Sequence, residues 1–115
     1  MRIVLKRVYD DTGATRGYRV LVDRLWPRGI SKEKLRMDEW LRDLAPTTEL
    51  RTWFHHEPSR WKSFRLRYLQ ELRSRRDDLN RLRAIATKKL LVLLYSAKDE
   101  EHNQAVVIRE ALLKK

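Results

Sequence analysis

The sequence predicts a small single-domain α/β protein with a short, mostly parallel sheet of about three strands, packed by helices. Three observations predict this fold class. The 115 residues favour one domain, 1–115, with room for one hydrophobic core. Strand-like segments lie near both ends of the chain, at 3–8, 18–23 and 90–95. Between them, every periodic segment from 37 to 87 has helical spacing, which predicts a helical block between the second and third strands.

The first two predicted strands lie close together in the chain. Residues 3–8 and 18–23 are rich in β-branched and aromatic side chains, and Gly13 and Gly17 punctuate the segment between them. The connection of about nine residues is shorter than the dozen or so that a parallel crossover usually needs. Taken alone, this connection favours an antiparallel pair.

A block of helices is predicted after the second strand. A loop containing Pro27 and Gly29 leads to Ser31, which can cap a short helix from about Lys32. The clearest helix spans about 58–74, because its large apolar residues fall on one face. Shorter periodic segments predict further helices around 40–44, 50–54 and 77–87.

The segment 90–95 is continuously apolar, as expected of a central strand covered on both faces. Ser96-x-x-Asp99 resembles a capping box with Asp in place of Glu, so 99–103 is predicted to form the first turn of a last helix. The helical connection before this strand is long enough for a parallel crossover. The second and third strands are therefore predicted to be parallel, with their C-terminal ends at one edge.

The first loop at that edge carries several charges beside a tryptophan. Open α/β sheets bind ligands outside the carboxyl ends of their strands. Arg24, Arg28 and Lys32 form a predicted cradle for a phosphate or carboxylate, and Asp23 is expected to orient Arg24 through a bidentate pair. In the alternative interpretation, Asp23 and Arg24 form a structural salt bridge while Trp26 closes the end of the core.

The second loop supplies candidate acid/base and hydrogen-bonding groups. The candidate catalytic residues are Asp23, Asp99 and His102. In the alternative interpretation, Asp99 only interacts favourably with the dipole at the N-terminus of the helix, and His102 is a core histidine whose hydrogen bonds are made within the protein. Trp26 and Tyr95 are predicted to wall the pocket and stack on a ring. The candidate ligand-binding residues are Arg24, Trp26, Arg28, Lys32, His56, Tyr95 and Asn103.

The positive charge suggests a second class of function. The net charge is +11, and the segment 58–89 holds eleven basic and three acidic residues. Arg67, Arg75 and Arg81 lie outside the apolar stripes and form a possible footprint for the phosphate backbone of a nucleic acid. The other interpretations are a solvated face that keeps the protein soluble and a surface for an acidic protein partner. No zinc-finger, bZIP or RRM signature accompanies the charge.

Several classes of site are excluded or weakly supported. The absence of cysteine excludes disulfides, thiolate metal sites and a cysteine nucleophile. Three histidines without H-E-x-x-H spacing give only weak support for a metal site, and three glycines provide no Walker or dinucleotide motif, so no cofactor is expected. No apolar run is long enough to span a bilayer, and the N-terminus becomes charged before a signal-peptide core forms. A cytoplasmic protein without a membrane partner is expected.

Taken together, several motifs resemble one family. They are Tyr18-Arg-Val-Leu-Val-Asp-Arg-Leu-Trp-Pro-Arg-Gly29, Leu44-Ala-Pro, Leu50-Arg-x-Trp-Phe-x-His56, Trp61-x-x-Phe64 with Tyr68, and Leu93-Leu-Tyr-Ser-Ala-Lys-Asp99 followed by His102-Asn103. They are similar to the domain-of-unknown-function 488 family, DUF488, in its short YeaO-like branch, over nearly the whole chain. The motif positions carried over are Asp23, Arg24, Trp26, Pro27, Arg28, His56, Trp61, Tyr95, Asp99, His102 and Asn103.

The resemblance implies a small α/β protein of the bacterial cytoplasm, with no settled activity and so no inherited catalytic role. Longer members of the family resemble proteins in which a helix joins the first two strands, which would make those strands parallel. This departs from the hairpin that the short connection favours here, and it leaves the pairing direction of the two strands open. The family usually has glycine before the histidine of the Trp-Phe motif, which makes His56 the motif residue and His55 an addition.

The leading hypothesis is a polar crevice at the C-terminal strand ends that binds or acts on a phosphorylated or nucleotide-like small molecule. The alternative is a nucleic-acid-associated or regulatory module that uses the basic segment 58–89. Whether the protein is an enzyme is left open.

Overall fold

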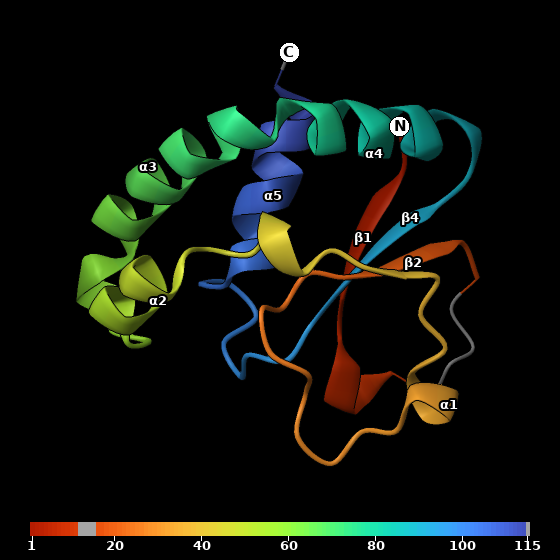
Figure 1. Ribbon diagram of the computed structural model, residues 1–115, viewed down its shortest axis with the longest axis horizontal. Helices are drawn as coiled ribbons and strands as arrows, with labels where there is room; N and C mark the ends of the chain where they lie inside the picture. Colours follow the sequence, from red (N-terminus) through yellow and green to blue (C-terminus); the bar gives the residue numbers. More distant parts are fainter. Residues whose placement is uncertain (12–15, 115) are drawn as a thin grey trace.

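The computed structural model describes residues 1–11 and 16–114 and has an α/β fold (Figure 1). Across these residues the sheet has four parallel strands in the order β1-β4-β2-β3, one more than predicted. The strands are β1 (Ile3–Arg7), β2 (Tyr18–Leu21), β3 (Glu39–Trp40) and β4 (Leu91–Tyr95). The α-helices are α1 (Lys32–Leu35), α2 (Thr48–Phe54), α3 (Trp61–Leu72), α4 (Arg76–Lys88) and α5 (Gln104–Leu113). Single 3₁₀ turns are η1 (Val8–Asp10), η2 (Arg42–Leu44), η3 (Pro58–Arg60) and η4 (Arg73–Arg75).

The first two strands do not pair with each other, so the predicted antiparallel hairpin is wrong. Both lie parallel to β4, one on each side, and Ile3 and Tyr18 are both register partners of Leu91. The continuous apolar run of β4 explains this arrangement, because a strand buried on both faces takes the centre of the sheet. Gly17 allows the close approach of β2, since a Cβ at this position would lie 2.4 Å from the Leu90 carbonyl oxygen. Gly13 lies outside the described residues.

A strand and a single 3₁₀ turn replace the helix predicted around 40–44. Glu39 and Trp40 pair with β2, and the Leu41 amide donates to the Leu21 carbonyl at 2.9 Å. The Trp40 indole nitrogen donates to the Asp23 carbonyl oxygen at 2.7 Å. Hydrogen bonds to the open edge of β2 therefore override the helical spacing of this short segment.

The sheet has two apolar faces of unequal size. Leu91, Leu93 and Tyr95 of β4 belong to the large core with the helices, whereas Val92 and Leu94 belong to a smaller cluster with Leu35 of α1. Helix α5 contacts β1 and β4 as well as α3 and α4, which run one after the other along one side of the molecule (Figure 1). The loops at the carboxyl ends of β2 and β4 are thus held between the sheet and the helices.

The two longest predicted helices are confirmed with small shifts of their ends. The apolar stripe of α3 is buried through Phe64, Tyr68 and Leu72, and the turn η4 separates α3 from α4. The Tyr68 hydroxyl donates to the Leu44 carbonyl oxygen at 2.6 Å, which ties α3 to the chain before α2. Within the described part of the chain, no helix is both long and apolar enough to cross a membrane.

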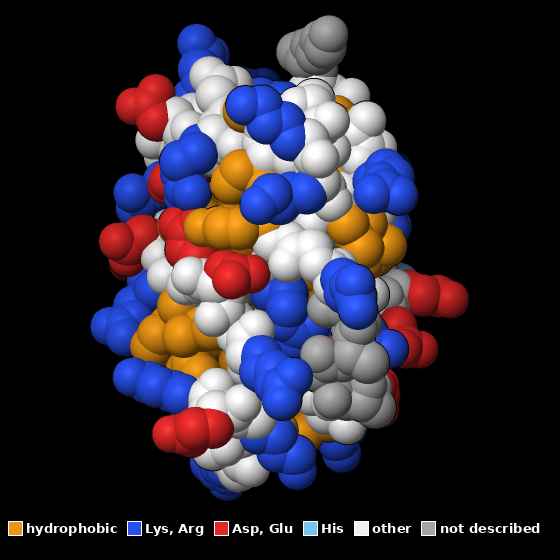
Figure 2. All heavy atoms as spheres, turned by 90° about the vertical axis from the view of Figure 1, so that its right-hand side faces the viewer, with side chains coloured by type: hydrophobic (Ala, Val, Ile, Leu, Met, Phe, Trp, Pro, Cys, Tyr) orange, Lys and Arg blue, Asp and Glu red, His pale blue; other side chains and the backbone are white. Residues whose placement is uncertain are grey.

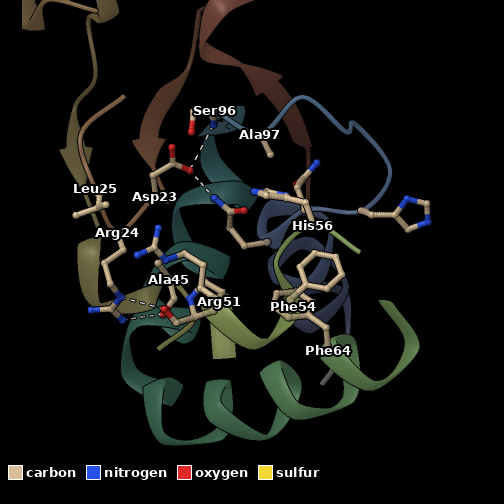
Figure 3. A pocket seen from close by; sticks show the side chains of 14 residues that line it. Asp23, Arg24, Leu25, Ala45, Arg51, Phe54, His56, Phe64, Ser96 and Ala97 are labelled. Atoms are coloured by element: carbon tan, nitrogen blue, oxygen red, sulfur yellow. Dashed lines mark hydrogen bonds between the residues drawn. The ribbon is translucent and has the colours of Figure 1, made fainter. Parts of the chain in front are cut away.

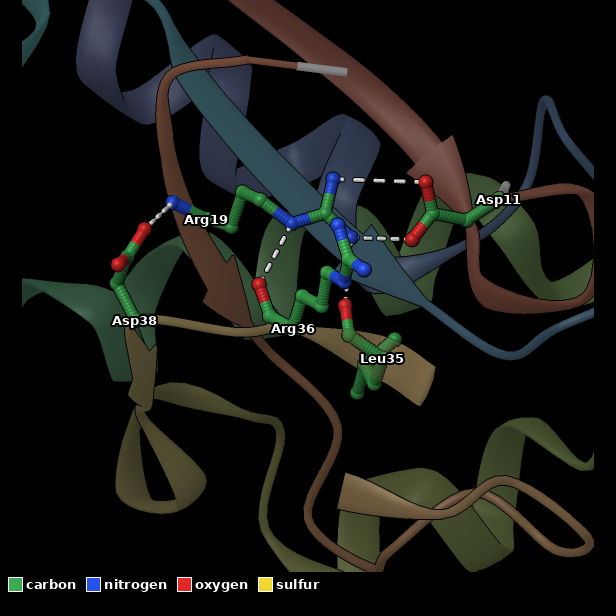
Figure 4. Close-up of polar contacts among 5 residues, drawn as sticks. All are labelled: Asp11, Arg19, Leu35, Arg36 and Asp38. Carbon is green, nitrogen blue, oxygen red and sulfur yellow. Dashed lines mark hydrogen bonds and ion pairs between the residues drawn. The ribbon is translucent and has the colours of Figure 1, made fainter. Parts of the chain in front are cut away.

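A buried arginine joins β2 to α1 (Figure 4). Arg19 is 5% exposed and forms an ion pair with Asp11. Its guanidinium also donates to the Leu35 carbonyl at 2.7 Å and to the Arg36 carbonyl at 2.8 Å. These contacts hold the C-terminal end of α1 against the smaller core, on the side of the sheet away from the long helices.

Candidate functional site

A cavity of about 140 Å³ opens at the edge of the sheet where β2 and β4 end (Figure 3). The parallel pairing of these strands confirms the prediction that their carboxyl ends share one edge. Asp23 and Arg24 follow β2, and Ser96 and Ala97 follow β4. Helices α2, α3 and the beginning of α5 supply the other walls. Segments distant in the sequence therefore converge on one concave site.

Asp23 is the buried carboxylate of this site and is 6% exposed. Its Oδ1 accepts hydrogen bonds from the Ser96 amide, at 3.4 Å, and from the Gln104 side-chain amide. Its Oδ2 has no hydrogen-bond partner among the described residues. Burial raises the pKa of Asp23, while the hydrogen bonds from Ser96 and Gln104 and the charge of Arg51 lower it. The pocket thus contains a carboxyl group in a poorly hydrated position.

Arg24 lines the pocket without pairing with Asp23. Its Nε donates to the Pro46 carbonyl at 2.9 Å and its Nη2 donates to the Ala45 carbonyl at 3.0 Å, with Asp43 4.0 Å away. The expected bidentate pair, and equally the structural salt bridge between Asp23 and Arg24, are wrong. The chain before α2 offers two carbonyl oxygens to the guanidinium, while Asp23 is held by Ser96 and Gln104.

Arg51 is a pocket residue that the sequence reasoning missed. It lies on α2, is exposed, and extends toward Asp23 in Figure 3. Within the described residues its guanidinium has no hydrogen bond and no ion pair. Arg51 stands three positions before Phe54 and so shares its face of α2. That spacing was the available signal.

Two phenylalanines form an apolar wall across the pocket from Asp23 and Arg24 (Figure 3). Phe54 and Phe64 are buried, and their ring centroids lie 4.4 Å apart. His56 lines the same pocket, as its motif position implied, whereas His55 does not. His55 has φ +46° and His56 has φ +53°, both in the left-handed region that favours glycine. This conformation ends α2 and turns the chain so that His56 reaches the pocket.

His102 is oriented by Asp99. The His102 Nδ1 lies 2.8 Å from an Asp99 carboxylate oxygen, and the imidazole packs edge-on against Trp61 with 5.1 Å between ring centroids. The hydrogen bond from His102 lowers the pKa of Asp99. His102 lines the pocket, so its other ring nitrogen is the one available to a ligand.

The residues 99–103 do not form the first turn of the last helix, and that prediction is wrong. Helix α5 begins at Gln104, because Asn103 is the N-cap and its side-chain oxygen accepts from the Val106 amide at 3.2 Å. Asp99 instead accepts from the amides of Glu101 and His102 within the loop. The true start of α5 places both Asn103 and Gln104 at the pocket. Gln104 was missed because the predicted helix began too early.

Four predicted ligand-binding residues lie outside this pocket. Trp26 belongs to the smaller core on the other face of the sheet, where its indole donates to the Ile30 carbonyl at 2.6 Å. Arg28 lines a separate cavity beside Tyr9, and Lys32 is exposed at the start of α1. Tyr95 is 3% exposed in the large core. Neither side chain walls the pocket: Tyr95, at the end of β4, is directed into the large core, and Trp26, in the loop after β2, packs against the smaller core.

The described residues form no transition-metal site. Across residues 1–11 and 16–114, no group of three or more His, Asp and Glu side chains could hold a metal ion. The histidines of the pocket, His56 and His102, line it beside arginines and apolar rings. The polar groups here suit hydrogen bonding to an organic ligand better than ligation of a cation.

The basic segment 58–89 contains arginines that already have partners within the molecule. Arg67 lies over the Trp53 ring, 4.4 Å from its centroid, and Arg81 forms a bidentate pair with Glu39. Arg75 is exposed in η4. Figure 2 shows Lys and Arg side chains spread over the height of one face, with acidic side chains and small apolar patches among them. On that face the positive charge does not gather into one stripe.

Comparison with known proteins gives relatives over nearly the whole chain. A family model described as the inactive DUF488-N3 subclade matches residues 2–115. The uncharacterized protein YeaO of Escherichia coli K12 is 49% identical over 112 residues, which are 97% of each chain. The uncharacterized proteins Mb3100c of Mycobacterium bovis and Rv3073c of Mycobacterium tuberculosis H37Rv are each 37% identical over 111 residues, 96% of this chain and 93% of theirs. No solved structure matches the chain significantly.

Proposed function

The chain belongs to the DUF488 family, within its inactive DUF488-N3 subclade, and we propose that it binds a phosphorylated or nucleotide-like small molecule in the pocket at the carboxyl ends of β2 and β4. The description of the subclade as inactive supports binding without turnover. In this proposal His102, oriented by Asp99, serves as a hydrogen-bonding group, and Arg51 holds the anionic group.

The observation that carries this proposal is the placement of Arg51. Its guanidinium lacks a partner among the described residues and lies at a cavity that also contains Arg24. An arginine fork matches the oxygens of a phosphate or carboxylate. Arg24 donates two hydrogen bonds to backbone carbonyls, but its positive charge still lies at the pocket. The two guanidiniums together favour an anion on this side of the site.

The nucleic-acid alternative receives less support from the contacts. Arg67 and Arg81 have intramolecular partners, so binding a phosphate backbone would compete with a cation–π contact and a bidentate ion pair. Of the three arginines assigned to this role, Arg75 is the one in the described structure without such a contact. The pocket, where several polar groups converge, is a more specific indication of a binding site than the basic segment 58–89.

Thermal unfolding in the presence of ligands tests the proposal. Inorganic phosphate, ribose phosphate and nucleoside monophosphates would be titrated against the parent protein and against Arg51→Gln. At about 100-fold excess over Kd, a ligand stabilises the folded state by about 2.7 kcal/mol, which raises Tm by several degrees. We expect this rise in the parent and its loss in Arg51→Gln.

The matched control is Arg73→Gln, which removes the same charge from an exposed position on η4 away from the pocket. This variant should keep the full ligand-dependent rise in Tm. The proposal fails if no compound of the panel stabilises the parent, or if Arg73→Gln abolishes the effect as fully as Arg51→Gln does.

A further inference from the structure

The Gln104 side chain has a fixed orientation at the pocket. Its amide nitrogen donates to the Asp23 carboxylate, which is an acceptor when ionised. This hydrogen bond determines which end of the amide is the oxygen. The Gln104 Oε1 has no hydrogen bond among the described residues and is not buried. The pocket therefore presents one oriented acceptor that a ligand N–H group can reach.

The interior of the pocket disfavours an anion. Asp23 lies on its wall at 6% exposure, and a carboxylate in such a position repels a second negative charge. The opposite wall consists of the rings of Phe54 and Phe64. Arg51, by contrast, is exposed. A ligand of mixed character should thus place a neutral, flat part inside and its anionic group outside, against Arg51.

The volume limits the size of the enclosed part. A cavity of about 150 Å³ holds a single benzene ring, and this cavity measures about 140 Å³. One six-membered ring fits that space, whereas the fused rings of a purine exceed it. The ring also needs an N–H donor for the Gln104 oxygen.

From this arrangement we infer that the pocket selects the pyrimidine ring of a nucleoside monophosphate, with a ring N–H donating to Gln104 Oε1 and the phosphate held by Arg51. Asp23 acts as a positioning residue, because it orients the Gln104 amide and does not itself touch the ligand. The inference rests on the proposed function and adds the class of ligand and its direction in the site.

Isothermal titration of the unmodified protein with four ligands provides the test. The ligands are uridine monophosphate, the same compound methylated on its ring N–H nitrogen, adenosine monophosphate and ribose phosphate. We expect uridine monophosphate to bind at least about tenfold more tightly than each of the others. The methylated compound is the sharpest probe, because it keeps the charge and the ring and removes the donor.

Two variants test the role of the Gln104 side chain. Gln104→Met should lower the affinity for uridine monophosphate at least about tenfold and bring it to that of the methylated compound. Gln70→Met, at an exposed position of α3, should leave both affinities unchanged. Because Gln104→Met also removes a partner of Asp23, a melting curve must first show that this variant is folded; the methylated ligand tests the same donor without any substitution.

The outcomes separate this inference from the proposed function. Equal affinity for uridine monophosphate and ribose phosphate, or tighter binding of adenosine monophosphate, would overturn the pyrimidine assignment and leave phosphate binding intact. Equal affinity for the methylated and unmethylated compounds would overturn the role of Gln104. If none of the four ligands binds, the proposed function and the inference both fail.

Discussion

The Asp23 carboxylate accepts a hydrogen bond from the side-chain amide of Gln104, which joins the end of β2 to the first turn of α5 across 81 positions of sequence. The same carboxylate accepts from the Ser96 amide after β4. One buried group thus connects three segments that form the pocket. Its remaining oxygen lacks a hydrogen bond in the described structure, so this connection includes a poorly solvated charge.

This burial predicts an unusual dependence of stability on pH. Because the pKa of Asp23 is raised in the folded state, the folded protein retains a proton there that the unfolded chain releases near its ordinary value of 3.8. The contribution of Asp23 to the free energy of unfolding should therefore fall as the pH rises from 3.8 through the folded-state pKa. Asp23→Asn lacks this titration, so its stability relative to the parent should improve over that range.

Urea unfolding of both proteins at several pH values between about 3.5 and 7 measures this difference. Each curve reports the free energy of unfolding, and the quantity of interest is its change with pH rather than its absolute value. A difference between the two proteins that stays constant over this range would contradict a raised pKa at Asp23.

The turn after α2 predicts a stabilising substitution. His55 is exposed and has φ +46°, a conformation that costs a residue with a Cβ about 1–2 kcal/mol and a glycine little. After the greater chain entropy of glycine in the unfolded state is subtracted, His55→Gly should stabilise the protein by about 0.5–1 kcal/mol. Thr52→Gly, inside α2, should instead lower stability. Lower stability of His55→Gly in urea unfolding would refute the strain at this position.

Periodicity and composition predicted most of the fold, and hydrogen bonding between distant strands decided the rest. The stripe of α3 and the apolar run of β4 were recognisable because each is long and uniform. The two residues of β3 form a strand only because the edge of β2 is open beside them, which no local pattern shows. The position of β1 beside β4 rather than β2 has the same origin.

The location of the site was predictable from the sequence, but the predicted set of site residues was incomplete. Parallel crossover placed the ends of β2 and β4 together, which brought Asp23 and His102 to one pocket. Alternation along the strands then directed Tyr95 away from it. Recognising Asn103 as the N-cap of α5 would have added Gln104, and the spacing of three residues between Arg51 and Phe54 on α2 would have added Arg51.

The ion pair between Glu39 and Arg81 predicts the opposite pH dependence from Asp23. The Glu39 carboxylate accepts two hydrogen bonds from Arg81, at 2.8 and 2.6 Å, and one from the Tyr18 hydroxyl at 2.8 Å. The hydrogen bond from Arg81 lowers the pKa of Glu39 below its ordinary value of 4.5. Its stabilising contribution is therefore complete above pH 4.5 and is lost as the pH falls through the lowered folded-state pKa.

Glu39→Gln should cost about 1 kcal/mol at pH 7, because the pair is partly exposed to solvent. The cost should shrink as the pH falls below 4.5, and urea unfolding at pH 7 and near pH 3 would reveal the change. Glu49→Gln, an exposed substitution in the first turn of α2, serves as the control for loss of one negative charge. A cost for Glu39→Gln that does not change between the two pH values would contradict the assigned pKa.

Two tyrosines offer a matched comparison of buried and exposed hydrogen bonds. Tyr68 is fully buried and donates to the Leu44 carbonyl at 2.6 Å, while Tyr9 is 44% exposed and donates to the Arg28 carbonyl at 2.8 Å. Tyr68→Phe leaves a carbonyl oxygen without its donor in the core and should cost about 1–2 kcal/mol. Tyr9→Phe should change stability by less than about 0.5 kcal/mol, because water replaces the donor.

The Tyr68 hydrogen bond also bears on the pocket. The Leu44 carbonyl that it holds comes directly before Ala45 and Pro46, whose carbonyls accept from Arg24. Loosening Leu44 should therefore weaken the ligand-dependent rise in Tm as well as lower the free energy of unfolding, whereas Tyr9→Phe should alter neither. Equal stability losses in the two variants would show that burial does not set the strength of the Tyr68 hydrogen bond. An undiminished ligand response in Tyr68→Phe would show that Arg24 is positioned without it.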